Sequence, residues 1–280
     1  MSVFRPGLFT GRVALVTGGG SGIGKAIAHE LLTLGCQVSI ASRNLERLDK
    51  AVEELRPRGD IQAVQCNIRN EEDVRAAVTS TLKTFGRLDY LVNNGGGQFP
   101  ALSEDITLKG WKAVIETNLT GTFLMTREVY RQHFEEHGGV VINIVADMFR
   151  GFPMMSHTGA ARAAVENLTK SWATEWAENG VRVNAVAPGI VFSPSARDNY
   201  SFDVFSEARS EIPAKRLGTP EEVSSAVCFL LSPGASFING ATLRVDAGGS
   251  LYSKLMKVIP EHSKMPAYKW QEDGTPASKL

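Results

Sequence analysis

Residues 13–24 read Val13-Ala14-Leu15-Val16-Thr17-Gly18-Gly19-Gly20-Ser21-Gly22-Ile23-Gly24, an apolar run followed directly by a glycine-rich loop. The run predicts a buried strand, and residues 23–34 predict a helix that starts at the end of the loop. Glycines let the backbone turn tightly and approach a pyrophosphate, whose charge the helix N-terminus attracts. A second apolar run at residues 38–41 completes the strand, loop, helix, strand order typical of dinucleotide binding.

The end of the second run predicts which dinucleotide binds. An acidic residue there would bond the ribose 2′-hydroxyl of NAD and repel the 2′-phosphate of NADP. This chain has Ser42 and Arg43 instead, with Arg47 one helical turn further on. A hydroxyl beside a guanidinium suits a phosphate, so the sequence predicts NADP(H). The alternative is that Arg43 and Arg47 are ordinary solvated charges.

Composition sets the class of protein. A length of 280 residues predicts a single domain over residues 1–280. Thirty Lys and Arg balance thirty Asp and Glu, so there is no basic footprint for nucleic acid or an anionic membrane. Cys36, Cys66 and Cys228 lie in apolar segments, which predicts buried free thiols and no metal site. No apolar stretch reaches the length of a membrane span, and residues 1–6 show no signal peptide, so we expect a soluble, non-secreted protein.

The last three residues are Ser278-Lys279-Leu280, the address that the peroxisomal import receptor reads. A polar stretch at residues 271–277 precedes them and would leave them accessible to that receptor. The sequence therefore predicts a peroxisomal location.

Short apolar runs alternate with helical patterns along the whole chain. This alternation predicts an α/β fold with a doubly wound, Rossmann-type parallel sheet of about seven strands. One intervening helix opens at Asn70 with acidic residues in its first turn and ends near Phe85-Gly86. Two regions lack a clear pattern: a variable lid at about residues 193–213 and a tail at about 250–280. The expected strands centre on Val13, Val38, Ala63, Tyr90, Val140, Val181 and Leu243.

Further motifs resemble the short-chain dehydrogenase/reductase family over residues 8–249. They are Asn93-Asn94-Gly95-Gly96, Asn118 within Glu116-Thr117-Asn118-Leu119, Pro188-Gly189, and Asp246-Ala247-Gly248-Gly249. The resemblance implies a homotetramer and a cofactor site made by Thr17, Gly18, Gly20, Ser21, Gly22, Ile23, Gly24, Ser42, Arg43, Arg47, Asn67, Ile68, Asn94, Gly95, Gly96, Arg162, Pro188, Gly189 and Val191.

The chain departs from that family where its catalytic residues normally stand. The family uses a Tyr as general acid, a Lys four residues later and a Ser that orients the substrate oxygen. Here Thr158 takes the Tyr position, Arg162 the Lys position, and Val145 or Ala146 the Ser position. A ketone reduction would lose a general acid worth about 10²- to 10⁴-fold in rate, so ordinary alcohol dehydrogenase activity is not favoured.

Reduction of a double bond conjugated to a thioester needs only donors that hold an enolate oxygen. The catalytic candidates are Arg162, Thr158, Asn118 and His157, with His157 or water as proton source. In this the chain is similar to the peroxisomal trans-2-enoyl-CoA reductase branch, with 2,4-dienoyl-CoA reductases as near relatives. The resemblance implies an acyl-CoA substrate and NADPH-dependent reduction of the 2,3 double bond of trans-2-enoyl-CoA in fatty acid metabolism. A 2,4-dienoyl-CoA reductase and a catalytically silent NADP(H)-binding scaffold stay open.

Several of these candidates also have a structural interpretation. His157 and Thr158 are typical of helix starts without a chemical role, and Arg162 could serve the cofactor ribose alone. Glu166 and Lys170, one turn apart on the same expected helix, are interpreted as structural residues, either solvated or at an interface. Their spacing also fits an ion pair.

Overall fold

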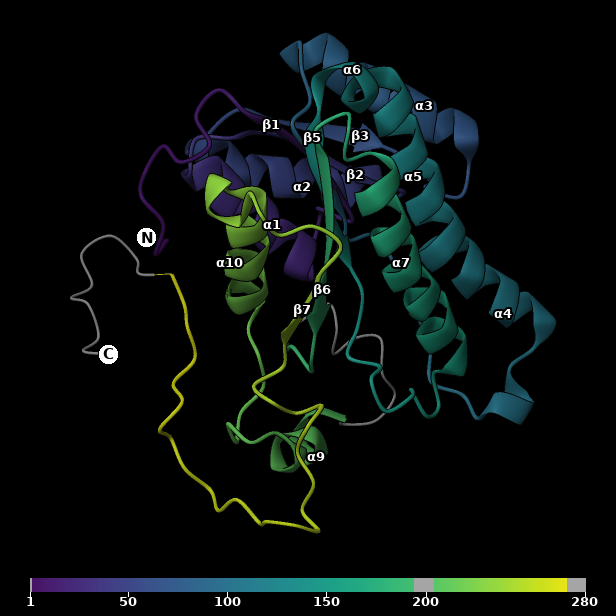
Figure 1. The fold of residues 1–280 in the computed structure, drawn as a ribbon, viewed down its shortest axis with the longest axis vertical. Helices are drawn as coiled ribbons and strands as arrows, with labels where there is room; N and C mark the ends of the chain where they lie inside the picture. The colour runs from purple at the N-terminus through teal and green to yellow at the C-terminus, as the bar shows by residue number, and fades with distance from the viewer. Residues whose placement is uncertain (1, 194–203, 271–280) are drawn as a thin grey trace.

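The computed structural model describes residues 2–193 and 204–270 and builds them around one parallel sheet (Figure 1). The strand order is β3-β2-β1-β4-β5-β6-β7. Every neighbouring pair is parallel, as the alternation of strands and helices predicts. The strands are β1 Val13–Thr17, β2 Gln37–Ser42, β3 Ile61–Gln65, β4 Tyr90–Asn93, β5 Gly139–Ile144, β6 Val181–Pro188 and β7 Thr242–Val245.

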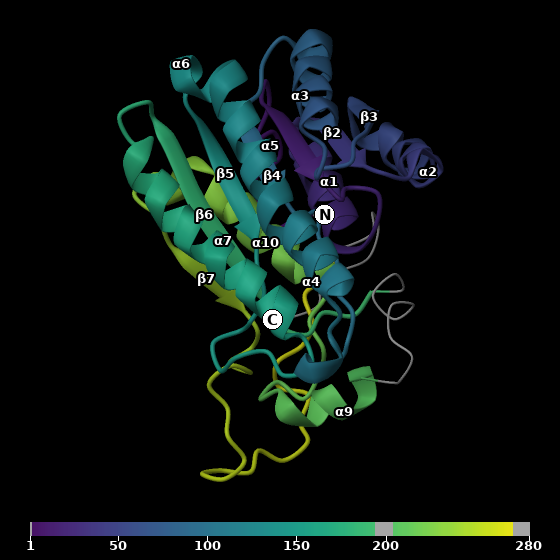
Figure 2. The same cartoon turned by 90° about the vertical axis from the view of Figure 1, so that its right-hand side faces the viewer.

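Helices cover both faces of this sheet, as Figures 1 and 2 show. One face carries α1 Gly22–Thr33, α2 Leu45–Leu55 and α10 Pro220–Leu231, and the other carries α3 Glu71–Phe85, α5 Gly121–Val129 and α7 Ser156–Glu175. The remaining described elements are η1 Arg56–Arg58, η2 Ser103–Asp105, α4 Leu108–Ile115, η3 Glu116–Thr120, η4 Tyr130–Phe134, α6 Glu135–His137, α9 Val204–Glu211 and η5 Pro233–Ala235.

The apolar runs become strands because the sheet is buried on both faces. All five residues of β1 are buried, and most of β5 and β6 is buried as well. Helix α3 begins after its N-cap Asn70, whose side chain accepts a hydrogen bond from the Asp73 N–H, and it ends at Gly86 in the left-handed conformation. The seven expected strands and the bounds expected for this helix are confirmed.

The strand order reverses at β1, because β2 lies on one side of it and β4 on the other. In doubly wound sheets such a switch point marks the crevice at the carboxyl ends of the strands where ligands bind. The glycine loop follows β1, and Asn94 to Gly96 follow β4.

Two regions differ from, or add to, the sequence expectation. The variable lid contains the helix α9, whose mixed composition hid its periodicity, while residues 194–203 lie outside the described part. The tail has no helix or strand up to residue 270, and Figure 1 shows it running from α9 back toward the N-terminal segment.

Two further expectations concern cysteines and membranes. Cys36, Cys66 and Cys228 are buried free thiols, as expected, and burial raises the pKa of each. Within residues 2–193 and 204–270, no helix combines the length and the apolar character that crossing a bilayer requires.

Candidate active site

The glycine loop is built without room for side chains. Gly18 has a φ of 67°, in the region that glycine favours. A Cβ atom on Gly24 would lie 2.4 Å from both the Gly18 carbonyl oxygen and Asn94 Nδ2. The loop therefore packs against the segment after β4, and the N-terminus of α1 opens into the crevice, as pyrophosphate binding requires.

Asn94 joins the loops after β1 and β4. Its side-chain Nδ2 donates to the Thr17 carbonyl oxygen at 3.1 Å. The Thr17 hydroxyl oxygen accepts from the backbone N–H groups of Asn94 and Gly95 at 3.0 and 2.8 Å. Ile68 packs here as well, because a Cβ on Gly95 would lie 3.2 Å from its Cδ1. The floor of the crevice is thus fixed by side chains that the sequence motifs contain.

The residues expected at the adenosine end lie beyond β2 and β3. Ser42 is half-buried and donates to the Asn44 carbonyl oxygen at 3.4 Å. Arg43 and Arg47 are exposed, and within the described chain no acidic group pairs with either side chain. Arg47 lies against the glycine loop, because a Cβ on Gly20 would sit 3.4 Å from its Cγ. The free guanidinium groups are therefore available to a phosphate at this end.

Asn67 follows β3 at the same end of the crevice. Its Oδ1 accepts from the backbone N–H and from Nε of Arg69, at 3.3 and 3.4 Å. In the described part of the chain its side-chain NH₂ group donates no hydrogen bond, so both donors are available to a ligand, as an amide that contacts a base would need.

Asn118 lies at the centre of the expected catalytic residues. It lies in η3, a single π-helical turn between α4 and α5, and such turns occur frequently at functional sites. Its Nδ2 donates to Thr158 Oγ1 at 2.8 Å and to the Gly97 carbonyl oxygen at 2.9 Å. Its Oδ1 accepts from the Gly97 N–H at 2.8 Å. Since Thr158 Oγ1 is an acceptor in this contact, its own proton stays available for donation.

Arg162 extends from α7 toward the same point. A Cβ on Gly96 would lie 2.5 Å from Arg162 Nη2 and 3.0 Å from Asn118 Oδ1, so both side chains border the space next to Gly96. Nη1 donates to the Ile144 carbonyl oxygen, while Nε is buried without a partner in the described chain. Burial lowers the pKa of Arg162 to about 10, so the group stays charged at neutral pH.

His157 is fully buried next to Thr158 at the start of α7. Its ring meets Phe99 edge-on, with centroids 4.5 Å apart. Burial lowers its pKa, so the imidazole is neutral at neutral pH. Phe99 and the start of α7 therefore enclose the ring, which is not at the surface.

The segment after β6 forms the far wall of the crevice. Pro188 accepts through its carbonyl oxygen from the Asp147 N–H at 3.1 Å, and a Cβ on Gly189 would lie 2.9 Å from the Asp246 Cα. Val191 forms an isolated parallel bridge with Gly218. These contacts bring the segment beside the ends of β5 and β7.

Asp147 is a neighbour of the site that the sequence motifs do not reveal. Burial is the main cause that raises its pKa, and the charge of Asp246 adds to the effect. A charged residue one or two positions after the expected Ser position, Val145 or Ala146, was the available signal. Glu166 and Lys170 contact each other at 3.5 Å on the outer part of α7, as a structural pair would.

The crevice fits a nicotinamide dinucleotide on two observations. A side chain on Gly18, Gly24 or Gly96 would collide with its neighbours. Glycines of this kind occur in loops whose backbone comes close to a bound ligand. Arg162 Nε is a buried donor that lacks a partner in the described chain, which a ribose or substrate oxygen would supply.

The comparisons with known proteins agree with this geometry. A family model described as Enoyl-(Acyl carrier protein) reductase matches residues 18–250. A peroxisomal 2,4-dienoyl-CoA reductase [(3E)-enoyl-CoA-producing] of Danio rerio is 38% identical over 90% of this chain and 85% of its own. The protein of the same name in Rattus norvegicus is 36% identical over 88% and 86%.

Solved structures give the same result. A citronellol catabolism dehydrogenase of Pseudomonas aeruginosa is 44% identical with a TM-score of 0.81, covering 89% of this chain and 99% of its own. A 3-ketoacyl-(acyl-carrier-protein) reductase of Brucella melitensis, solved with NADH, is 33% identical with a TM-score of 0.81 over 87% and 100%. The chain therefore belongs to the short-chain dehydrogenase/reductase family of oxidoreductases, which use a nicotinamide dinucleotide.

Proposed function

We propose that this protein is an NADPH-dependent reductase of a carbon–carbon double bond conjugated to a CoA thioester. The observation that carries the proposal is the cluster around Asn118, in which Thr158 and Arg162 stand where the family has its Tyr and Lys. This cluster offers a hydroxyl donor and a cation, and it lacks a phenol that could act as general acid at that position.

The residues would act on charge that appears during the reaction. Bound NADPH would supply the hydride, which goes to the far carbon of the conjugated system. The electron pair of the double bond then moves onto the thioester oxygen, where Thr158 Oγ1 donates a hydrogen bond and Arg162 provides positive charge. Asn118 holds Thr158 in place. The enolate carbon takes its proton from water, because the neutral imidazole of His157 is too weak an acid to supply it.

Two substrates satisfy the same chemistry. The names of the relatives from Danio rerio and Rattus norvegicus favour a 2,4-dienoyl-CoA over the trans-2-enoyl-CoA that the sequence analysis expects. A 2,4-dienoyl-CoA spreads the negative charge over a longer system but presents the same thioester oxygen to Thr158 and Arg162. We therefore take 2,4-dienoyl-CoA as the first candidate and trans-2-enoyl-CoA as the second.

NADPH oxidation by the purified protein tests the proposal with three thioesters of equal chain length: a 2,4-dienoyl-CoA, a trans-2-enoyl-CoA and a 3-ketoacyl-CoA. We expect turnover of at least one unsaturated thioester and little or none of the ketone. Arg162→Met should lower kcat by about 10²-fold or more, because it removes a charge aimed at the developing oxyanion. Lys170→Met is the matched control, since it removes an exposed cation from the same helix.

Two outcomes would reject this function. Rapid reduction of the ketone with neither unsaturated thioester reduced would mean that the site works as an alcohol dehydrogenase without the usual Tyr. Tight NADPH binding with no turnover of any thioester would favour the silent scaffold.

A peroxisomal location and a homotetrameric assembly belong to the same proposal. The import address Ser278-Lys279-Leu280 lies outside the described residues, so its support is the sequence itself and the peroxisomal relatives. An N-terminal fluorescent fusion should collect in peroxisomes and become diffuse when Leu280 is deleted.

A further inference from the structure

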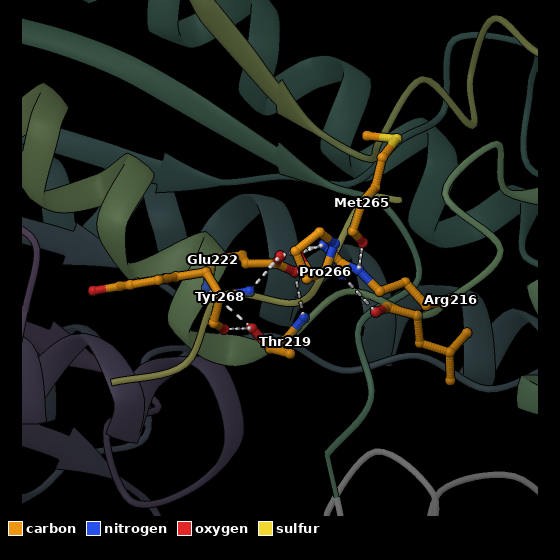
Figure 3. Close-up of polar contacts among 7 residues, drawn as sticks. Arg216, Thr219, Glu222, Met265, Pro266 and Tyr268 are labelled. Carbon is orange, nitrogen blue, oxygen red and sulfur yellow. Dashed lines mark hydrogen bonds and ion pairs between the residues drawn. The ribbon is translucent and has the colours of Figure 1, made fainter. Parts of the chain in front are cut away.

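The C-terminal strap, which we define as residues 251–270, leaves the sheet after β7 and returns to the core beside α10 (Figures 1 and 3). On its way it contacts the α9–α10 loop, residues 212–219. It ends with Trp270 stacked on His29 of α1 at a centroid distance of 4.0 Å. The proposed function gives this strap no role.

Arg216 holds the strap to the α9–α10 loop, as Figure 3 shows. Its Nε donates to the Met265 carbonyl oxygen at 2.6 Å, and Nη2 donates to that of Pro266 at 3.0 Å. Nη1 donates to the Leu217 carbonyl oxygen at 3.0 Å. Nη1 and Nη2 also bind the Glu222 carboxylate, at 3.0 and 2.6 Å. These five contacts use every N–H group of the guanidinium, which only an arginine can do.

Glu222 also binds both the α9–α10 loop and the strap. Its carboxylate accepts from the backbone N–H groups of Thr219 and Tyr268 at 2.9 and 3.2 Å, and the Thr219 hydroxyl donates to the Tyr268 carbonyl oxygen at 3.0 Å. Burial alone would raise the pKa of Glu222, but the hydrogen bonds from Arg216 and the two N–H groups outweigh burial and lower it. The strap is thus fixed to the N-terminus of α10 by a charged pair.

The α9–α10 loop touches the site two residues beyond Arg216. The Gly218 N–H donates to the Ile190 carbonyl oxygen at 2.9 Å, and the Phe192 N–H donates to the Gly218 carbonyl oxygen at 3.0 Å. This two-bond bridge fixes the segment after β6, residues 190–192. A pocket of about 300 Å³ lies behind Ile190, bordered also by Ala226 and Leu243. Val191 packs against the core and Phe192 meets the ring of Phe205 from α9, and the bridge adds the backbone hydrogen bonds that join the segment to the α9–α10 loop.

The segment 190–192 borders the nicotinamide half of the crevice. The glycine loop after β1 takes the pyrophosphate, and the residues after β2 take the adenosine ribose. A dinucleotide that crosses the switch point must then extend its other half over β4, β5 and β6. Pro188 and Gly189, at the end of β6, lead directly into the segment.

We propose that Arg216 is a positioning residue: by joining the C-terminal strap to α10, it holds residues 190–192 against the nicotinamide half of the bound dinucleotide. The proposal rests on the proposed function only in requiring that the protein bind NADPH. It requires no particular acyl-CoA substrate.

The test compares two ligands on the full-length protein. NADPH contains the nicotinamide, and 2′,5′-ADP contains only the adenosine half. We expect Arg216→Met to weaken NADPH binding fivefold or more, while 2′,5′-ADP binding stays within twofold of the wild type. Arg216→Lys should restore NADPH binding only in part, because one ammonium group cannot span the strap carbonyls and the Glu222 carboxylate.

Arg87→Met is the matched control. Arg87 makes a two-bond contact with Asp89 at 2.6 and 2.8 Å, but it precedes β4 and so lies at the opposite end of the sheet. It should leave both affinities unchanged. The proposal would be overturned if Arg216→Met weakened the binding of both ligands equally or left NADPH binding unchanged. If Arg216→Lys bound NADPH as tightly as the wild type, a guanidinium would not be required at this position. If the wild type binds NADH instead, the same comparison uses NADH and ADP, so a wrong cofactor assignment is detected separately.

Discussion

Arg43 stands at the end of β2 with an exposed guanidinium that no acidic side chain of the described chain pairs with. A 2′-phosphate placed there would gain a charge-assisted contact. We expect Arg43→Asp to lower kcat/KM for NADPH by about tenfold or more, since hydrogen bonds to charged groups are worth about 1.5–3 kcal/mol. The same change should favour NADH, because a carboxylate can accept from the ribose 2′-hydroxyl.

Arg56→Asp is the control for this change, because Arg56 is also exposed and the net charge changes equally. Initial rates with each dinucleotide give the preference. An NADPH to NADH ratio that stays constant in Arg43→Asp would show that Arg43 is an ordinary solvated charge.

Single residues differ in how well the sequence predicts them. Asn118, Thr158 and Arg162 were expected at the site and the structure gathers them, because they belong to motifs with fixed spacing on elements that the fold brings together. Asp147 was missed because its place depends on β6, whose Pro188 accepts its N–H. The ring of Phe99 over His157 was missed for the same reason, since that contact joins the loop after β4 to α7.

At the scale of elements, two helix caps differ in what they hold. Asn70 caps α3 alone, whereas the Thr219 hydroxyl caps α10 and also donates to the Tyr268 carbonyl oxygen of the strap. We expect Asn70→Ala to lower the free energy of unfolding by about 1 kcal/mol. Thr219→Ala should cost more, by about 1 kcal/mol for the lost strap contact.

Urea unfolding of both variants measures this difference, with equal m-values as the condition for comparing them. Equal losses in the two variants would mean that the strap contact adds nothing to stability.

Helices and strands could be predicted from the sequence where burial gave them a clear apolar pattern. The strands β1 and β6 are continuous apolar runs, because both faces of the sheet are covered. Helix α9 gives no such signal. It meets the strap through exposed polar contacts of Arg209 and Ser210. Its Phe205 packs against Phe192 in the segment after β6. The π turn η3 was also not predicted, because it changes the hydrogen-bond spacing from i→i+4 to i→i+5 over only five residues of an otherwise helical stretch.

At the scale of the whole molecule, the strap joins the C-terminal part of the described chain to its first residues and to α1. The Tyr268 hydroxyl accepts from the Val3 N–H at 3.1 Å, and Trp270 covers His29. Such contacts join residues more than 240 positions apart and follow no local pattern. For this reason the sequence predicts no structure for the tail. They also link the strap to the protonation state of His29.

Burial lowers the pKa of His29 to about 4, and the charges of Arg58, the N-terminus and Lys25 add to the effect. The unfolded chain, with a His pKa near 6.5, therefore binds more protons than the folded chain between pH 6.5 and 4. The contribution of His29 to the free energy of unfolding is fully present above pH 6.5 and is lost as the pH falls through that window. Because His29 is partly exposed, we expect a contribution of about 1 kcal/mol, or roughly 2 °C in Tm.

Thermal unfolding at pH 7 and pH 5 measures this effect in the wild type and in His29→Gln. The wild type should lose more stability than the variant over this interval, since the amide of a glutamine side chain cannot take up a proton. Burial also lowers the pKa of His133 and His157, but both contribute equally to the two proteins, so the difference reports His29 alone. Parallel curves for the two proteins would mean that the pKa of His29 is not lowered in the folded protein.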